Sequence, residues 1–275
     1  MLSARFAAAA AAADEDEGDP APDAGWHFLP DERIYFPRLA DPRWPHFSLS
    51  YDRMTRRMAF PDFRDSARVV LGEHIGMVEY VTPGGDRWGV GLQPAVFALF
   101  NLDAPSDHLV NADYRLGVPL DFRTGPFSAE AVVTHQSSHL GSSVAAVIED
   151  EQLSYEVLTL DGSVDVGALR FYAGFGYVLH SFPRGIGPWS ARQGAEWSSQ
   201  DGDSFGPVAA VQVDEREDSG WLLDLSVRAG VEFIDPRRYR RRFQILLEYY
   251  RGQDPNGQFF RERIEYVGLG IHFYF

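Results

Sequence analysis

The stretch VGLGIHFYF, residues 267–275, decides the fold. Successive side chains of a strand point to opposite faces, so this stretch has one apolar face and one face of small or polar residues. Val267, Leu269, Ile271, Phe273 and Phe275 share the first face, and Gly268, Gly270, His272 and Tyr274 share the second. A strand of this kind suits a wall with lipid on one side and a polar interior on the other.

The same alternation recurs upstream. It is clean in 88–102, 110–122, 221–233 and 239–249, and weaker or more mixed in 46–54, 66–81, 126–138, 152–160, 167–181, 188–198 and 205–213. With 260–275 the segments number about twelve, and single-chain bacterial barrels have an even number of strands. The sequence therefore predicts an all-β fold, a transmembrane antiparallel up-and-down β-barrel of about 12 strands.

The connections favour a barrel over a soluble sandwich. The gaps at 55–65 and 139–151 are long, whereas 82–86, with Gly84 and Gly85, and 123–126 are short turns. Long outer loops and short inner turns alternate in this way in outer-membrane barrels. The alternation predicts that Phe275 lies at the periplasmic end, with the short turns.

Composition excludes several classes of protein. There is no run of about 18 apolar residues, which excludes a helical membrane span. The absence of Cys excludes disulfides and thiolate metal sites. A net charge of -15 argues against nucleic-acid binding. His135 and His139 lie roughly 13 Å apart along an extended strand and cannot easily bind the same metal ion. No metal site is therefore predicted.

The chain divides into three parts. Residues 1–25, an Ala run followed by an acidic segment, read equally well as a secretory signal or as a disordered tail, and lie outside the predicted fold. Residues 26–45 are too rich in Pro for a spanning strand and precede the barrel. Residues 46–275 form the predicted barrel.

Two resemblances bear on location. The stretch from Trp26-His27-Phe28-Leu29-Pro30 to Arg43, with the later His135–Gly141, resembles a bacterial outer-membrane family known only as domain of unknown function 1207, from about residue 26 to the end. The last strand, ending on Phe275, looks like the signal that the barrel assembly machinery recognises. These resemblances imply a bacterial outer-membrane protein with membrane lipids and that machinery as partners. Neither implies an activity or an oligomeric state.

A candidate catalytic site lies in the segment 126–138. His135 and Ser137 lie on the same face as the apolar residues of this segment, and their Cα atoms are roughly 6.7 Å apart. At that distance the imidazole of His135 can reach the hydroxyl of Ser137, as a base must to activate a nucleophile. His-x-Ser on a barrel exterior resembles the dyad of outer-membrane phospholipase A and the lipid A deacylases. That resemblance implies a third residue on the next strand, for which Glu156 is chosen over Glu149, Asp150 and Glu151. The residues themselves predict no cofactor, and only the resemblance to these enzymes suggests calcium as one.

Two other interpretations stay open. His135 and His139 can be interfacial residues at the lipid headgroups, with Ser137 as a neutral spacer. The protein would then be a narrow pore or a plugged, structural barrel, since a barrel of this size has little free bore. Charged interior candidates for either role are Asp113, Arg115, Asp224, Arg228 and Glu232.

Overall fold

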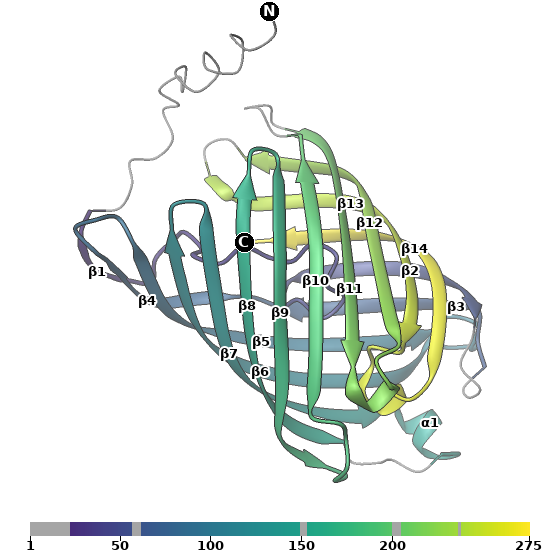
Figure 1. The fold of residues 1–275 in the computed structure, drawn as a ribbon. Coiled ribbons are helices and arrows are strands. Elements are labelled where there is room, and N and C mark those ends of the chain that lie inside the picture. Colours follow the sequence, from purple (N-terminus) through teal and green to yellow (C-terminus); the bar gives the residue numbers. More distant parts are fainter. Residues whose placement is uncertain (1–22, 57–61, 149–152, 200–204, 236–237) are drawn as a thin grey trace, which may run out of the picture.

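A computed structural model describes residues 23–56, 62–148, 153–199, 205–235 and 238–275 (Figure 1). The predicted signal-like segment falls almost wholly outside these ranges. The first strands are β1 (Gly25–Phe28), β2 (Phe47–Arg56), β3 (Asp65–Gly72), β4 (Ile75–Val81), β5 (Arg87–Asn101), β6 (His108–Thr124) and β7 (Phe127–Leu140). They are followed by β8 (Ser154–Val166), β9 (Leu169–Phe182), β10 (Trp189–Ser198), β11 (Phe205–Arg216), β12 (Leu223–Asp235), β13 (Arg238–Gln253) and β14 (Arg263–Tyr274). The short helices are α1 (Ser142–Ala145), η1 (Glu217–Ser219) and η2 (Gly257–Phe259), and no described helix is long and apolar enough to cross a membrane.

The strands form a closed antiparallel barrel. Each strand from β5 to β14 pairs with the next, β14 pairs with β2, and β2 pairs with β3. The ring closes on β5, which pairs with β6 along one edge and with both β3 and β4 along the other. Since β3 and β4 take successive positions along β5, they occupy one place in the ring, interrupted at Glu73 and His74. In the described part of the chain β1 pairs with β4 alone and is not a member of the ring, so the ring has the predicted 12 strands.

The alternating patterns mark the two surfaces of the wall as predicted. On β6, Tyr114, Leu116, Val118 and Leu120 are exposed, whereas Asn111, Asp113 and Asp121 are buried in the lumen. On β14 the apolar set that ends in Phe275 is exposed, and His272 and Tyr274 are buried. The outer surface thus carries the apolar band that a lipid bilayer requires.

The connections separate the two ends of the barrel. Short links at 82–86, 125–126 and 167–168, together with the C-terminus, gather at what we call the turn end. The links 102–107, 183–188, 217–222 and 254–262, with the described residues 141–148 and 153, gather at the loop end, where α1, η1 and η2 also lie. Figure 1 shows the β8–β9 turn and α1 at opposite ends of the barrel.

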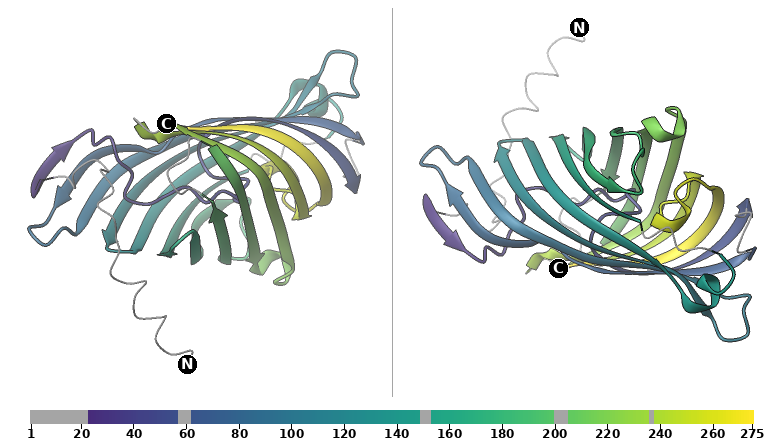
Figure 2. Two further views of the ribbon diagram at one scale, coloured as in Figure 1. Left: turned by 90° about the horizontal axis from the view of Figure 1, so that it is seen from above. Right: turned by 90° about the horizontal axis from the view of Figure 1, so that it is seen from below.

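Residues 30–46, which we call the plug, lie inside the lumen. The purple segment runs within the curved sheet in Figure 2, and it buries Tyr35 and Trp44 almost completely. Prolines at 30, 37, 42 and 45 remove amide donors, so the plug does not extend a strand ladder. Its carbonyls instead accept hydrogen bonds from the wall: Arg170 donates to Pro37 and Arg228 to Leu39, both at 2.7 Å. The Pro-rich segment thus precedes the barrel in sequence and occupies its interior in space.

Candidate functional site

His135 and Ser137 lie on the outward face of β7, in its loop-end half. Thr134, Gln136 and Ser138, between and beside them, are buried in the lumen. In the sheet register His135 is opposite Leu116 on β6 and Glu156 on β8, and Ser137 is opposite Tyr114 and Ser154. Because the strand period is two, His135 and Ser137 must share a face wherever this strand is regular.

Glu156 holds His135 in place. The Nδ1 atom of His135 lies 2.7 Å from Oε1 of Glu156, so the carboxylate accepts the hydrogen bond of that nitrogen. This leaves Nε2 of His135 without a hydrogen-bond partner among the described residues. An acidic group on one imidazole nitrogen and a free second nitrogen form the arrangement in which a His acts as a base. The rival acids Glu149, Asp150 and Glu151 fall outside the described residues.

Ser137 completes the set on the same surface. It lies two positions beyond His135 on β7, and no hydrogen bond between the two side chains is present in the described part of the chain. Such contacts are often long in an empty site and shorten when substrate binds. The structure thus gathers the three predicted residues on two adjacent strands, with their functional groups facing away from the lumen.

A second histidine, which the sequence pattern did not predict, also contacts Glu156. His180 on β9 places Nδ1 3.0 Å from Oε2 of Glu156, so one carboxylate bridges two imidazoles. Arg170 and Tyr172 of β9 are buried in the lumen, and strict alternation along the strand would place His180 there as well. The register shifts between Glu156 and Val157, which are opposite His180 and Val178, and Leu179 is the extra residue. This bulge turns His180 outward, and bulges of this kind leave no local signal in the sequence.

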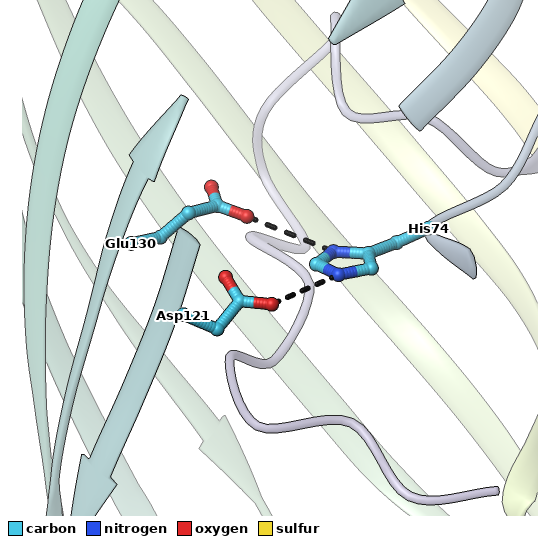
Figure 3. A group of neighbouring side chains, drawn as sticks. All are labelled: His74, Asp121 and Glu130. Atoms are coloured by element: carbon cyan, nitrogen blue, oxygen red, sulfur yellow. Dashed lines mark ion pairs between the residues drawn. The ribbon is translucent and has the colours of Figure 1, made fainter. Parts of the chain in front are cut away.

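The lumen holds a separate cluster near the turn end, formed by His74, Asp121 and Glu130 (Figure 3). Nε2 of His74 lies 3.0 Å from Asp121, and Nδ1 lies 3.6 Å from Glu130. One imidazole and two carboxylates are ligand types that suit a divalent metal ion. The ring lies between the two acids and faces one with each nitrogen, and one ligand atom of each of the three residues lies within 4.8 Å of the others. As it stands, the cluster links the break between β3 and β4 to β6 and β7 on the same side of the barrel.

Solved structures similar to this one are outer-membrane barrels. Outer membrane phospholipase A of Escherichia coli, as an active-site mutant, is 12% identical with a TM-score of 0.57, covering 84% of this chain and 92% of that one. The Salmonella typhi phospholipase, a dimer with bound calcium, is 12% identical with a TM-score of 0.56, covering 83% and 90%. The β domain of the Bordetella autotransporter BrkA is 13% identical with a TM-score of 0.48, covering 84% and 100%. At these identities the likeness to the two phospholipases shows the barrel fold alone.

The family resemblance seen in the sequence is confirmed. Among curated proteins no relative matches the chain. The family model described as protein of unknown function (DUF1207) matches residues 24–275, so the chain belongs to the DUF1207 family.

Proposed function

We propose that the protein is an outer-membrane hydrolase of lipid acyl esters, with Ser137 as nucleophile, His135 as general base and Glu156 as the residue that orients His135. The observation that carries the proposal is the hydrogen bond that Nδ1 of His135 donates to Glu156. It lies on the outward face of the wall, which also presents Ser137. An acid, an imidazole and a hydroxyl in this order are the parts of a serine hydrolase.

The chemistry follows from the free nitrogen of His135. Nε2 removes the proton of the Ser137 hydroxyl as Oγ attacks the ester carbonyl, and the alcohol then leaves with that proton, so that an acyl-serine remains. The same nitrogen then takes a proton from water as the water attacks the acyl-serine, and it returns that proton to Oγ of Ser137 as the bond to the acyl group breaks and the fatty acid leaves. The role of Glu156 is to hold the ring in one tautomer and to stabilise its positive charge. His180 shares the carboxylate and limits its rotation.

The location of the site suggests its substrates. In barrels of this kind the short turns face the periplasm and the long loops face outward. With the turn end inside, His135 and Ser137 lie at the level of the outer leaflet, beside the acyl esters of phospholipids or lipid A. The exposed final strand, with Phe275 at its end, would be the segment read by the assembly machinery.

The test is esterase activity of the refolded full chain on phospholipid and on lipid A in mixed micelles, with calcium and with chelator. Ser137→Ala and His135→Ala should each lower activity by a factor of about 100 or more. Ser154→Ala is the matched control, because Ser154 is directly opposite Ser137 on the same face. Activity that is absent in the wild type, or equal in all four proteins, would remove the proposal.

The second candidate is a non-enzymatic plugged barrel. The observation that favours it is the plug, which is hydrogen-bonded to the wall on several sides and occupies the lumen. The same observation speaks against an open pore. If the esterase test fails, a structural or binding role of the plugged barrel becomes the leading interpretation.

A further inference from the structure

A cavity of about 220 Å³ lies inside the barrel, on the loop-end side of the plug. We call it the loop-end pocket. Its floor is Asp41, Pro42 and Arg43 of the plug, and its wall comes from β6 to β13. Residues of the connections 183–188, 217–222 and 254–262 form its rim. The pocket therefore opens toward the end of the barrel that carries the long loops, and it lies on the opposite side of the wall from His135 and Ser137.

Four arginines line this pocket, and three of them have acidic partners. Arg43 pairs with Asp113 at 2.8 Å, and Arg216 with Asp224 at 3.5 Å. Arg192 lies between Asp161 and Asp41, at 3.6 and 3.8 Å. These three guanidinium groups are neutralised within the protein.

Arg115 is different. Its Nη1 donates to the carbonyl of Arg43 at 2.9 Å, and no carboxylate of the described residues lies within ion-pair distance. Its Nε is buried and has no hydrogen-bond partner in the same part of the chain. A guanidinium removed from water without a counter-charge is costly, and such groups are normally paired.

Thr134 adds a second unsatisfied donor beside Arg115. Its Oγ1 is buried and has no partner among the described residues. Thr134 is opposite Gly117 in the register, two positions along β6 from Arg115, and both side chains line the pocket. Tyr155, Tyr250 and Phe260 line it as well and supply apolar surface. Four aspartates line the pocket as well: Asp41 and Asp224 face Arg192 and Arg216, Asp214 accepts a hydrogen bond from Gln212 at 2.7 Å, and Asp218 lies at the rim. The pocket thus combines these acids with the guanidinium of Arg115, the hydroxyl of Thr134 and aromatic walls.

We propose that the loop-end pocket binds a compact organic anion, a carboxylate or phosphate ester on a body of about the size of one sugar ring. The anion would accept hydrogen bonds from Arg115 and Thr134, and the body would pack against the aromatic side chains. Guanidinium groups suit both carboxylates and phosphates, because their planar donors match two acceptor oxygens. The ligand enters from the loop end, since the plug closes the other side.

The experiment titrates the refolded full chain in micelles with galacturonate, glucose 6-phosphate and glucose, by calorimetry. One or both anions should bind saturably and glucose should not, and the two anionic probes separate the carboxylate from the phosphate ligand. Arg115→Gln should weaken binding by about tenfold or more, as expected for a lost charged hydrogen bond. Thr134→Val removes only the hydroxyl and should weaken it less, with unchanged stability.

Arg184→Gln is the matched control, because Arg184 is exposed in the rim connection 183–188 and does not line the pocket. It removes the same charge near the mouth and should bind as the wild type does. Ser137→Ala should also bind normally, so the outcome is independent of the proposed hydrolase. The proposal is overturned if no anion binds saturably, if glucose binds equally well, or if Arg115→Gln and Arg184→Gln behave alike.

Discussion

At the scale of single residues, the outward site depends on one carboxylate that serves two imidazoles. Glu156 contacts His135 through one oxygen and His180 through the other. Both oxygens are acceptors only while the group is ionised, whereas a Gln in its place offers one acceptor and one donor. The orientation of His135 therefore depends on the charge of residue 156 as well as on its shape.

We expect Glu156→Gln to lower kcat for lipid ester hydrolysis by about 10- to 100-fold with little change in KM, because a residue that orients the base acts on the chemical step. His180→Ala should have a smaller effect, since His180 contacts Glu156 and not Ser137. Steady-state kinetics of both variants on one phospholipid substrate measures this. A rise in KM at unchanged kcat would contradict an orienting role.

A second residue-scale effect concerns Asp254, in the loop that follows β13. Burial raises the pKa of Asp254 from 3.8 to about 7, although hydrogen bonds from Asn256 favour its charged form. Since the folded pKa is the higher one, the folded state holds a proton that the unfolded state has lost. The resulting stabilisation is complete below about pH 4 and is lost as the pH rises through about 7.

Asp254→Asn should therefore stabilise the protein at pH 8 and leave it nearly unchanged at pH 4. A shift of about three pKa units sets an upper bound of about 4 kcal/mol on the difference. Denaturant unfolding in micelles at the two pH values checks this. An equal effect of the substitution at both values would show that Asp254 does not titrate in this range.

At the scale of elements, the plug and β10 depend on each other. Glu196 on β10 accepts a hydrogen bond from the amide of Leu39 at 2.6 Å and lies 3.5 Å from Arg170. Arg170 in turn donates to the carbonyl of Pro37. A segment without strand pairing is thus fixed by charged side chains of the wall, which satisfy backbone groups that would otherwise be buried and unpaired.

Glu196→Ala should destabilise the barrel by about 3–5 kcal/mol, the usual cost of leaving a buried partner charge uncompensated. It should also expose residues 30–46 to protease. The measurements are the unfolding midpoint and limited proteolysis of the refolded protein. Glu215→Ala on the adjacent β11, whose side chain makes no described hydrogen bond or ion pair, is the control and should change neither.

At the scale of the whole molecule, the closed ring of twelve strands encloses the plug. Lumen charges predicted from alternation, among them Asp113, Asp224, Arg228 and Glu232, are indeed buried inside the wall. Arg228 donates a hydrogen bond to the carbonyl of Leu39 in the plug and forms an ion pair with Glu248 at 3.3 Å. The charges of the interior therefore hold the plug in the lumen.

We expect the full chain to show little conductance in planar bilayers, and a chain that starts at residue 47 to show a clear increase. Removal of the plug exposes a polar lumen, whereas the twelve-strand wall remains. Single-channel recordings of both proteins decide this. Heat-modifiable migration on gels controls for correct folding, and equal conductance of two folded barrels would mean that the plug does not block the lumen.

The sequence by itself determined the wall of this protein. Alternation is a local property with a period of two, so β6, β12 and β14 could be recognised residue by residue, and the twelve places in the ring could be counted. The pairing of Glu156 with His135 was also within reach, since it requires only two adjacent strands joined by one loop. The family resemblance rested on other stretches, Trp26 to Arg43 and His135–Gly141, and the family model confirms it.

Only the tertiary structure decided what occupies the interior and which further side chains meet. His180 reaches Glu156 because a bulge reverses the parity of β9 near its end. Leu39 of the plug donates to Glu196, and Arg115 donates to the carbonyl of Arg43 and has no ion pair within the described part of the chain. Both contacts join residues far apart in the sequence. Such contacts depend on strand register and on the path of a segment without regular structure. Neither has a local period, so the alternation that revealed the barrel carries no information about them.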